Sequence, residues 1–356
     1  MLFIFISLLF IVWISVIYLS LDKKEEKKDD NLVIFDYENT EIAQEFKNLN
    51  IKHEKFANVY NKAKEYIVWS DNLLKSIIIW ILADDWHILV EWFPWLAKTK
   101  TILVYSKLLN LDFKRVQFTP DMLPSDIIWG EIYDRKVSDF KTFLWPVFTN
   151  LLLADEINRA TPKVQSALLE AMQEKKVTIW WNTYELNSPF FVMATQNPIE
   201  NEWTFPLPEA QVDRFLIKVL VKYPNKDIEL SIIDNYSKNI ESIKPLLSKD
   251  ELLLSQKQVN EIFVSDEVKE YIVWIIDNLR KKDDYILLWP SPRASISLLK
   301  VAKIVAYLQN KNFVDKKDVI YWILPVLRHR IKLSMKASIE NKSIDCIIVK
   351  KVLHYK

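Results

Sequence analysis

The chain has 356 residues, and its 48 Lys and Arg residues against 47 Asp and Glu residues leave a net charge of +1. This length suggests two folded units, and a hydrophobic content of 50% excludes wholesale disorder. The balanced charge gives no global electrostatic reason to expect a nucleic-acid-binding protein. The single cysteine, Cys346, excludes an intramolecular disulfide framework, and the four histidines share no metal-ligand spacing, so a zinc enzyme is not expected.

Glycine and tryptophan occur in unusual numbers. The chain has one glycine, Gly130, and 14 tryptophans, whereas average usage of about 7% would give roughly 25 glycines. Most of the tryptophans fall in stretches with a turn or loop pattern: Trp69, Trp86, Trp92, Trp95, Trp129, Trp145, Trp180, Trp181, Trp203 and Trp289. Because turns need backbone angles that glycine adopts most easily, we infer that many or all of the tryptophans are glycines in the living protein, encoded by a reassigned UGA codon. The alternative is a genuinely tryptophan-rich, glycine-poor protein.

The first 21 residues are mostly Leu, Ile, Phe and Val and include no charged side chain. A run of about 20 such residues is long enough to cross a membrane once, so a transmembrane helix is predicted over residues 1–21. Lysines follow directly, which by the positive-inside rule predicts an anchored protein at the cytoplasmic face of the cell membrane. The alternatives are a buried helix and a mis-assigned start at Met1, in which case the protein would be cytoplasmic.

Strand-like and helical stretches alternate over residues 53–223. The short apolar runs are His87–Glu91, Arg115–Phe118, Leu151–Ala154 and Phe190–Ala194. This alternation predicts an α/β core with a largely parallel sheet. Residues 22–52 are expected to form a charged spacer and an N-terminal helical segment, and residues 224–356 a second, helical domain. A hairpin is predicted within residues 177–186.

The strongest chemical signal is a strand, a loop and a helix between His87 and Thr99. This order is typical of a phosphate-binding loop, in which a lysine neutralises the phosphates of ATP and a hydroxyl ligates Mg²⁺. The predicted nucleotide-binding residues are Trp92, Phe93, Pro94, Trp95, Leu96, Ala97, Lys98 and Thr99. Glycines at positions 92 and 95 would let the backbone approach the phosphates, whereas two indoles would fill the site.

Two further apolar strands end in polar side chains. The first ends in Asp155 and Glu156, which in a phosphate-loop ATPase would hold the Mg²⁺ and polarise the attacking water. The alternative is a strand followed by a helix N-cap, a position that Asp favours. The second ends in Asn197, which is expected to orient the attacking water. Arg214 and Arg293 are candidates to contact the γ-phosphate, or else they form surface ion pairs.

At these residues the chain resembles the MoxR family of AAA+ ATPases, from about His53 to the C-terminus. The most specific stretches are residues 117–126, 154–160, 165–173, 194–198 and 207–215. Family members carry glycine at many of the tryptophan positions, including 92 and 95, which supports the recoding hypothesis. The resemblance implies a three-layer αβα P-loop core over residues 53–223 and a small all-α lid over residues 224–356, here joined to the predicted transmembrane helix.

The resemblance also implies a role for each site residue. The loop from Trp92 to Thr99 would be the Walker A motif, Asp155 and Glu156 the Walker B acids, Asn197 sensor one, Arg214 an arginine finger that reaches a neighbouring subunit, and Arg293 the sensor-two arginine of the lid. Arg159 is a second candidate for the finger, and the segment from Trp129 to Phe140 corresponds to an insertion that engages clients.

Family membership further implies assembly and partners. An arginine donated to a neighbour requires a homo-oligomer, by analogy a hexameric ring. Chaperone-like remodelling of a protein client is expected, often beside a protein with a von Willebrand A domain, and no nucleic acid is expected. Two alternatives remain: a nucleic-acid motor on the same core, and an inactive membrane-tethered scaffold if the loop tryptophans are real.

Peptide mass spectrometry of the native protein tests the recoding hypothesis. We expect the peptide that spans Glu91 to Lys98 to carry glycine at positions 92 and 95, because only a loop without bulky side chains leaves room for phosphates. A peptide mass that requires tryptophan at both positions would refute the hypothesis and favour the scaffold.

Overall fold

The computed structural model describes most of the chain beyond its first 48 residues. The described residues are 49–84, 86–92, 98–134, 139–144, 146–179, 182–197, 204–221, 226–235 and 238–353. The chain divides into two compact units, residues 1–40 and 41–356, and every described residue belongs to the second unit.

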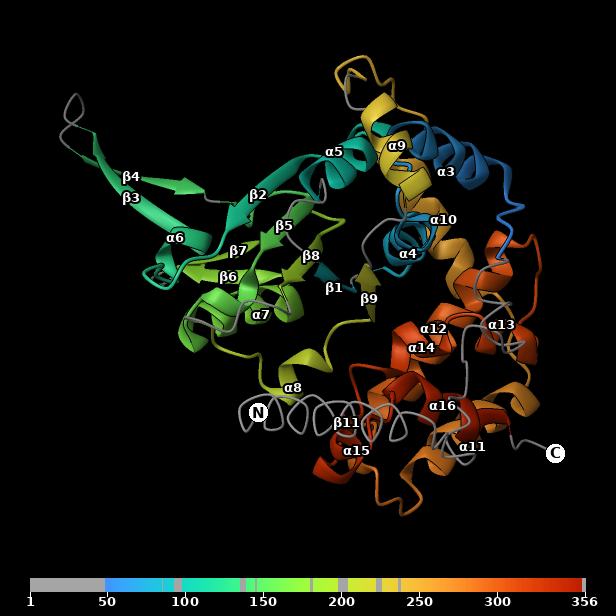
Figure 1. The fold of residues 1–356 in the computed structure, drawn as a ribbon. Helices are drawn as coiled ribbons and strands as arrows, with labels where there is room; N and C mark the ends of the chain where they lie inside the picture. Colours follow the sequence, from blue (N-terminus) through green and yellow to red (C-terminus); the bar gives the residue numbers. More distant parts are fainter. Residues whose placement is uncertain are drawn as a thin grey trace, which may run out of the picture. The chain divides into compact units, whose positions relative to one another are not determined.

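A five-stranded parallel sheet forms the centre of the core (Figure 1). Its strands stand in the order β2 (Phe113–Gln117), β5 (Leu151–Asp155), β8 (Phe191–Gln196), β1 (Ile88–Trp92) and β9 (Ile217–Val221). Every neighbouring pair is parallel, as the alternation of strands and helices predicts. All five carboxyl ends therefore meet at one edge of the sheet.

Helices cover both faces of this sheet, which is why β5 is buried along its whole length. On one face, α7 (Pro162–Glu174) packs through Leu168 against a cluster that includes Leu152 and Val192. The opposite face carries α4 (Asp71–Leu82) and α5 (Lys98–Leu108), and α3 (Glu54–Tyr66) packs on both of these helices. Trp80 of α4 meets Phe191 edge to face, with ring centroids 5.5 Å apart.

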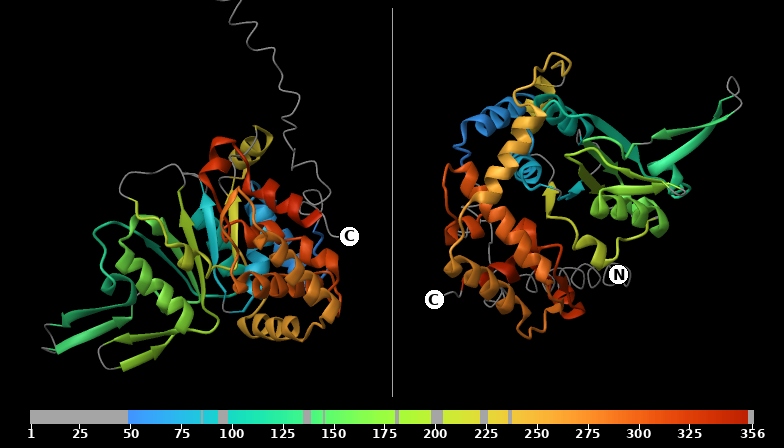
Figure 2. Two further views of the ribbon diagram at one scale, coloured as in Figure 1. Left: turned by 90° about the horizontal axis from the view of Figure 1, so that it is seen from below. Right: turned by 180° about the vertical axis from the view of Figure 1, so that it is seen from behind.

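Two antiparallel hairpins extend from the core. The first pairs β3 (Trp129–Asp134) with β4 (Asp139–Leu144) and projects away from the sheet in both Figure 1 and Figure 2. The second pairs β6 (Lys176–Ile179) with β7 (Asn182–Glu185), where a hairpin is predicted from the sequence. Shorter elements link the strands: α6 (Ser125–Ile128), η2 (Ile157–Arg159) and α8 (Glu209–Val212).

The C-terminal part of the chain is helical. α9 (Lys226–Asp234; yellow in Figure 1) lies beside α5. The helical lid follows (orange to red in Figure 1). Its helices are α10 (Lys249–Glu261), α11 (Asp266–Arg280), α12 (Pro292–Leu308), α13 (Lys316–Ile320), α14 (Ile323–Leu327), α15 (Met335–Ile339) and α16 (Ile344–Leu353), with a small sheet of β10 (Ile286–Leu288) and β11 (Lys332–Leu333). Serine N-caps start several of them, because the hydroxyl satisfies a free N–H of the first turn: Ser248, Ser265, Ser291 and Ser334.

The predicted membrane helix requires a correction. In the part of the chain that the structure describes, no helix is long and apolar enough to cross a bilayer. The longest of these helices, α12, has 17 residues and so spans about 26 Å, less than the roughly 30 Å of a hydrocarbon core, and it carries Arg293, Lys300 and Lys303. Residues 1–21, on which the prediction falls, lie outside the described residues. The fold is the α/β core with its lid, and the membrane-anchored location loses its basis.

Candidate functional site

The carboxyl edge of the sheet gathers the predicted chemical residues. β1 leads at Trp92 into the predicted phosphate loop, β5 ends at Asp155, and Asn197 follows the end of β8. The parallel register places these strand ends level with one another, since Glu91 pairs with Gln196. Residues 93–97 of the loop lie outside the described residues. The chain continues at Lys98, the first residue of α5.

Lys98, at the start of α5, contacts Asp155, at the end of β5. Its Nζ lies 3.4 Å from Oδ1 of Asp155, and both side chains are largely buried. Lys98 and Thr99 stand in the first turn of α5, where free backbone N–H groups and the helix dipole favour an anion. A phosphate group would find a fixed ammonium, a hydroxyl and amide donors here.

Besides Lys98, two side chains hold Asp155. Thr195 donates its hydroxyl to Oδ1 at 2.6 Å, and Arg115 donates Nε and Nη2 to Oδ2 at 3.2 and 2.7 Å. Burial opposes ionisation of Asp155, but the hydrogen bonds and the neighbouring cationic groups outweigh burial, so the pKa of Asp155 lies below its ordinary value. Asp155 is therefore a buried carboxylate that stays charged at neutral pH, which suits a Mg²⁺ ligand.

Glu156 turns sharply away from β5. Its φ of 57° is in the left-handed region, an arrangement that costs about 1–2 kcal/mol for a residue with a Cβ. Its carboxylate accepts hydrogen bonds from Gln117 at 2.8 Å and Arg159 at 3.1 Å, while its N–H donates to Thr195. Glu156 is the N-cap of η2 without a capping bond from its side chain, so the helix-cap alternative for this pair of acids is not realised.

Three residues of this site escaped the sequence analysis: Arg115, Gln117 and Thr195. Arg115 and Gln117 lie two positions apart on β2, so their side chains share one face of the strand. Gln117 pairs in register with Asp155. Thr195 lies two residues before Asn197 on β8, and its hydroxyl contacts both acids. For Thr195 alone, the position of a polar residue near the end of an otherwise apolar strand was a signal, although it does not name the partners of the hydroxyl.

Asn197 and the lid meet at a cavity of about 400 Å³. Asn197 is buried, and the cavity wall also includes Glu91 of β1 and Arg328 and His329 of the lid. Burial and nearby cationic groups hold the pKa of His329 well below its ordinary value, so its imidazole is neutral.

Arg214 lies at the opposite edge of the sheet. It precedes β9, whose first residue, Ile217, pairs with Ile88, the first residue of β1. In Figure 1, the chain runs from α8 through a short connection into the start of β9. A strand of this length separates the two edges by about 15 Å, more than an arginine side chain can span. Arg214 instead lines a pocket with Glu170 of α7, and its Nε is buried with no hydrogen-bond partner among the described residues.

Arg293 lies near Arg214 and not near Lys98. It stands in the first turn of α12, where its side chain is exposed and its N–H bonds to Ser291. Ser291 in turn donates to Asp213, the residue before Arg214. Arg159, the second finger candidate, pairs with Glu156 of its own subunit. The structure therefore brings Lys98, Asp155, Glu156 and Asn197 to one edge, and Arg214 and Arg293 to the other.

An apolar cavity of about 410 Å³ opens beside α5. Its walls include Leu103 of α5, Val68 and Trp69 ahead of α4, and Ile232 of α9. The Trp69 indole N–H is buried there and has no hydrogen-bond partner among the described residues. A flat apolar ligand next to the phosphate loop would fit this cavity.

The backbone angles of the described tryptophans do not support the inference that these positions need glycine for a turn. Among the described residues, positive φ occurs at Asp84, Asn110, Glu156, Lys175, Asn310 and Asn341 and at none of the tryptophans. Trp80 and Trp322 are fully buried in the helical regions. The recoding hypothesis thus depends on the loop at positions 92 and 95 and on the family pattern.

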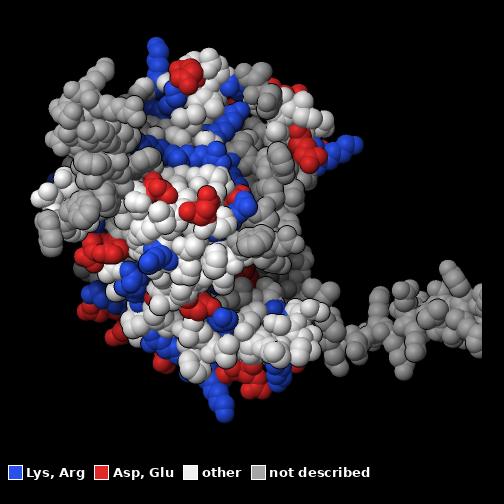
Figure 3. All heavy atoms as spheres, turned by 90° about the vertical axis from the view of Figure 1, so that its left-hand side faces the viewer, with Lys and Arg blue, Asp and Glu red and all other residues white. Residues whose placement is uncertain are grey.

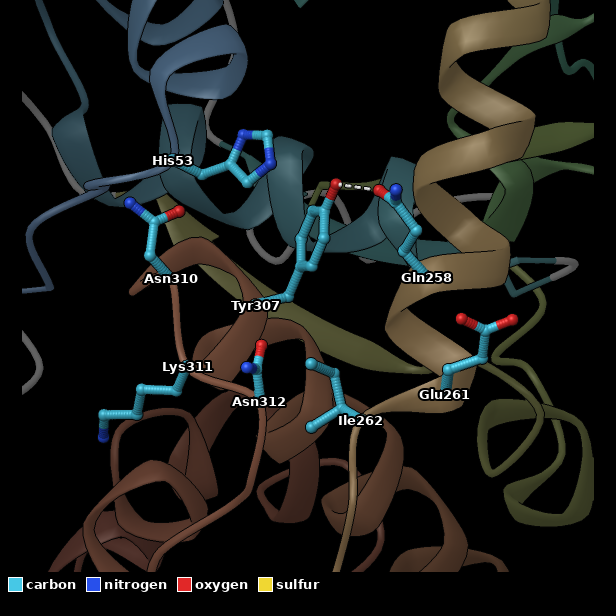
Figure 4. Close-up of a pocket in the computed structure, with 8 residues that line it drawn as sticks. All are labelled: His53, Gln258, Glu261, Ile262, Tyr307, Asn310, Lys311 and Asn312. Carbon is cyan, nitrogen blue, oxygen red and sulfur yellow. Dashed lines mark hydrogen bonds between the residues drawn. The ribbon is translucent and has the colours of Figure 1, made fainter.

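A further cavity, of about 500 Å³, lies elsewhere (Figure 4). His53 stacks on Tyr307 there with ring centroids 4.5 Å apart, and the Tyr307 hydroxyl donates to Gln258 at 2.8 Å. None of the predicted site residues lines it. We therefore place the chemistry at the edge of the sheet and not in this cavity.

Surface charge offers no large field of one sign on the face in Figure 3. Basic and acidic side chains both occur across its described surface, which agrees with the balanced charge of the chain. A nucleic-acid motor finds no specific support in this distribution.

Thr195→Val tests the network around the two acids. We expect it to lower the free energy of unfolding at pH 7 by about 1–3 kcal/mol, because the Asp155 carboxylate and the Glu156 N–H lose a partner. The folded-state pKa of Asp155 is lowered, so the stabilisation is present above the unfolded-state pKa and is lost as pH falls through the folded value. Urea unfolding should show the difference from wild type shrinking below about pH 4. Thr195→Ser keeps the hydroxyl and is the control; a difference that stays constant down to about pH 3 would contradict the assignment.

Comparison with known proteins agrees with this geometry. Residues 87–217 match the family described as "ATPase family associated with various cellular activities (AAA)", and residues 282–349 match the "AAA lid domain". The first match contains the strand ends and both acids, and the second contains α12 with Arg293.

Individual relatives cover most of the chain. It is 42% identical to the uncharacterized protein YeaC of Bacillus subtilis, over 74% of this chain and 82% of the relative. It is 40% identical to Chaperone MoxR1 of Mycobacterium tuberculosis, over 81% of this chain and 78% of the relative. A crystal structure of a candidate ATPase from Cytophaga hutchinsonii superposes with a TM-score of 0.80 at 37% identity, covering 88% of this chain and 97% of that one. The chain therefore belongs to the MoxR family of AAA+ ATPases, and it is an enzyme that hydrolyses ATP.

Proposed function

We propose that the chain hydrolyses Mg²⁺-bound ATP at the carboxyl edge of its sheet and uses the energy to remodel a protein client. The observation that carries the proposal is the contact of Lys98 with Asp155 at the end of β5, next to Glu156, with Thr195 bonded to both acids. Phosphates would bind between the loop of residues 92–97 and Lys98, with the base in the apolar cavity beside Leu103.

The donor set fits a magnesium ion. Asp155 offers a charged, buried carboxylate and Thr99 a hydroxyl, and oxygen donors of this kind suit Mg²⁺. When bound, the ion supplies charge neutralisation at the transferring phosphate. Among the described residues no cluster of three acidic, His or Cys side chains occurs, which is consistent with an ion held by few protein ligands and by phosphate oxygens.

Glu156 is proposed as the general base. Its carboxylate would accept the proton of the water that attacks the γ-phosphorus, and Asn197 would orient that water. Gln117 and Arg159 currently hold the carboxylate against β2 and η2. Turnover then requires Glu156 to exchange one of these partners for the water.

Arg214 and Arg293 are proposed to act on a neighbouring subunit. Both lie at the amino edge of the sheet, away from the phosphate site of their own chain. AAA+ ATPases of this family typically oligomerise, and we propose a ring, by analogy a hexamer, in which each subunit completes the site of the next. The guanidinium groups would stabilise charge on the transferring phosphate.

The client function rests on the family. The relative from Mycobacterium tuberculosis is named a chaperone, and on that ground we propose chaperone-like maturation of protein complexes, with a von Willebrand A domain protein as the partner class. We also keep the domain division at residues 223 and 224 as a proposal. Glycines at positions 92 and 95 are part of the same proposal, since the loop must admit phosphates.

Lys98→Ala tests the phosphate site. We expect the Kd for ATP to rise at least about 100-fold, because a partly buried ammonium no longer contacts the phosphates. Lys107→Ala is the matched control, since Lys107 stands in the last turn of the same helix and pairs with Glu241 at the surface. Binding of a fluorescent ATP analogue provides the measurement, and full affinity and turnover in Lys98→Ala would remove this site from the proposal.

Glu156→Gln tests the catalytic base. We expect kcat to fall by about 10²–10⁴-fold while the Kd for ATP stays within a few-fold of wild type, because the amide can hydrogen bond but cannot take the proton. Glu185→Gln, an exposed carboxylate on β7, controls for the loss of one negative charge. Steady-state phosphate release and equilibrium binding separate the two effects; unchanged kcat would assign the base to another residue.

A further inference from the structure

Asp213 connects the two arginines across the boundary between core and lid. It follows α8 and directly precedes Arg214. Its Oδ2 accepts a hydrogen bond from the Ser291 hydroxyl at 2.7 Å. Ser291 is the N-cap of α12, and its oxygen also accepts the N–H of Arg293 at 3.1 Å. One carboxylate and one hydroxyl thus join the segment that carries Arg214 to the helix that carries Arg293.

Arg330 fixes this connection from inside the lid. It is 3% exposed, and its Nε donates to Oδ1 of Asp213 at 3.0 Å. Its Nη groups donate to the carbonyls of Phe215 at 2.6 Å and Leu216 at 3.1 Å, and to the Ser297 hydroxyl of α12 at 2.9 Å. One guanidinium therefore holds both the backbone that flanks Arg214 and the helix of Arg293.

The charges at this connection resist separation. Burial lowers the pKa of Arg330 to about 10 in spite of Asp213, so the guanidinium stays charged at neutral pH. Pulling the lid from the core would break the ion pair with Asp213 and the hydrogen bonds of Arg330 to the carbonyls of Phe215 and Leu216. The segment of residues 213–216 and the start of α12 therefore move together.

We propose that Asp213, Ser291 and Arg330 form a positioning unit that holds Arg214 and Arg293 as one pair, presented to the phosphates bound by a second copy of this chain. This inference rests on the proposed function, in which both arginines act on a neighbour. The pair comes from two domains, so its spacing depends on the lid-to-core contact. Arg214 is half-buried in the wall of a pocket and Arg293 has an exposed side chain, so both guanidinium groups can be reached from outside the chain.

Ser291→Ala is the chosen variant, because truncation of Asp213 would leave Arg330 buried without a counter-ion and would destabilise the fold. Ser265→Ala is its matched control. Ser265 is also an N-cap serine of the lid, and its hydroxyl accepts the N–H of Val268. Both variants lose a helix cap, and only Ser291→Ala loses the bond to Asp213.

We expect Ser291→Ala to lower kcat about tenfold with an unchanged Kd for ATP, the fold-change that one hydrogen bond to a charged group corresponds to. Ser265→Ala should lower the melting temperature as much as Ser291→Ala does, because both lose a helix cap, but it should keep the wild-type kcat. Equal kcat values for the two variants would overturn the positioning unit.

Mixed oligomers decide whether the defect acts on the neighbour. Ser291→Ala subunits are mixed with an excess of Glu156→Gln subunits, which have an intact arginine pair but an inactive site of their own. We expect turnover per Ser291→Ala subunit to rise several-fold toward the wild-type value, because each such site then faces an intact pair.

Arg214→Ala in the same mixture is the reference. If Arg214→Ala subunits are rescued and Ser291→Ala subunits are not, the positioning unit is refuted while the proposed function stands. If Arg214→Ala subunits are not rescued although the chains co-assemble, the action of the arginines on a neighbour fails, and the proposed function must change.

Discussion

A buried carboxylate at the end of β5 sets the conditions for the rest of the core. Asp155 is enclosed by the sheet and remains charged only because Thr195, Arg115 and Lys98 supply hydrogen bonds and opposite charge. A charge buried without such partners would cost several kcal/mol. The start of α5 and the ends of β2 and β8 must therefore keep their places around it, which constrains this edge of the sheet.

The same constraint explains the strained backbone that follows. Glu156 adopts positive φ, and the strain persists because its N–H bonds to Thr195, the residue that also holds Asp155. The turn directs the Glu156 carboxylate away from the strand, toward Gln117 and Arg159. The Thr195 hydroxyl on β8 thus helps to set the distance between Asp155, the proposed Mg²⁺ ligand, and Glu156, the proposed general base.

Local pattern accounts for what could be read from the sequence. Apolar runs that end in acids or an amide predicted the strand ends, and a parallel sheet brings such ends together, so Asp155, Glu156 and Asn197 were found. Arg115, Gln117 and Thr195 were missed because their partners are defined by register, which no local pattern reveals. The predicted membrane helix falls on residues 1–21, outside the described residues, and no described helix is long and apolar enough to cross a bilayer, so the prediction has no support in the fold. The contacts of Asp213 join residues 78 and 117 positions apart in the chain, beyond any local pattern.

The two edges of the sheet divide the proposed chemistry between subunits. Phosphate-binding and acidic residues occupy the carboxyl edge, while Arg214 and Arg293 occupy the amino edge, a strand length of about 15 Å away. In the proposed reaction the two arginines therefore act on the phosphates of a neighbouring chain. Head-to-tail contacts, in which the amino edge of one copy faces the carboxyl edge of the next, would satisfy both requirements of the proposal, and such heterologous contacts form a ring when the rotation between copies closes. The rigid connection through Asp213 then matters because the two arginines must arrive at the neighbour together, although they come from different domains.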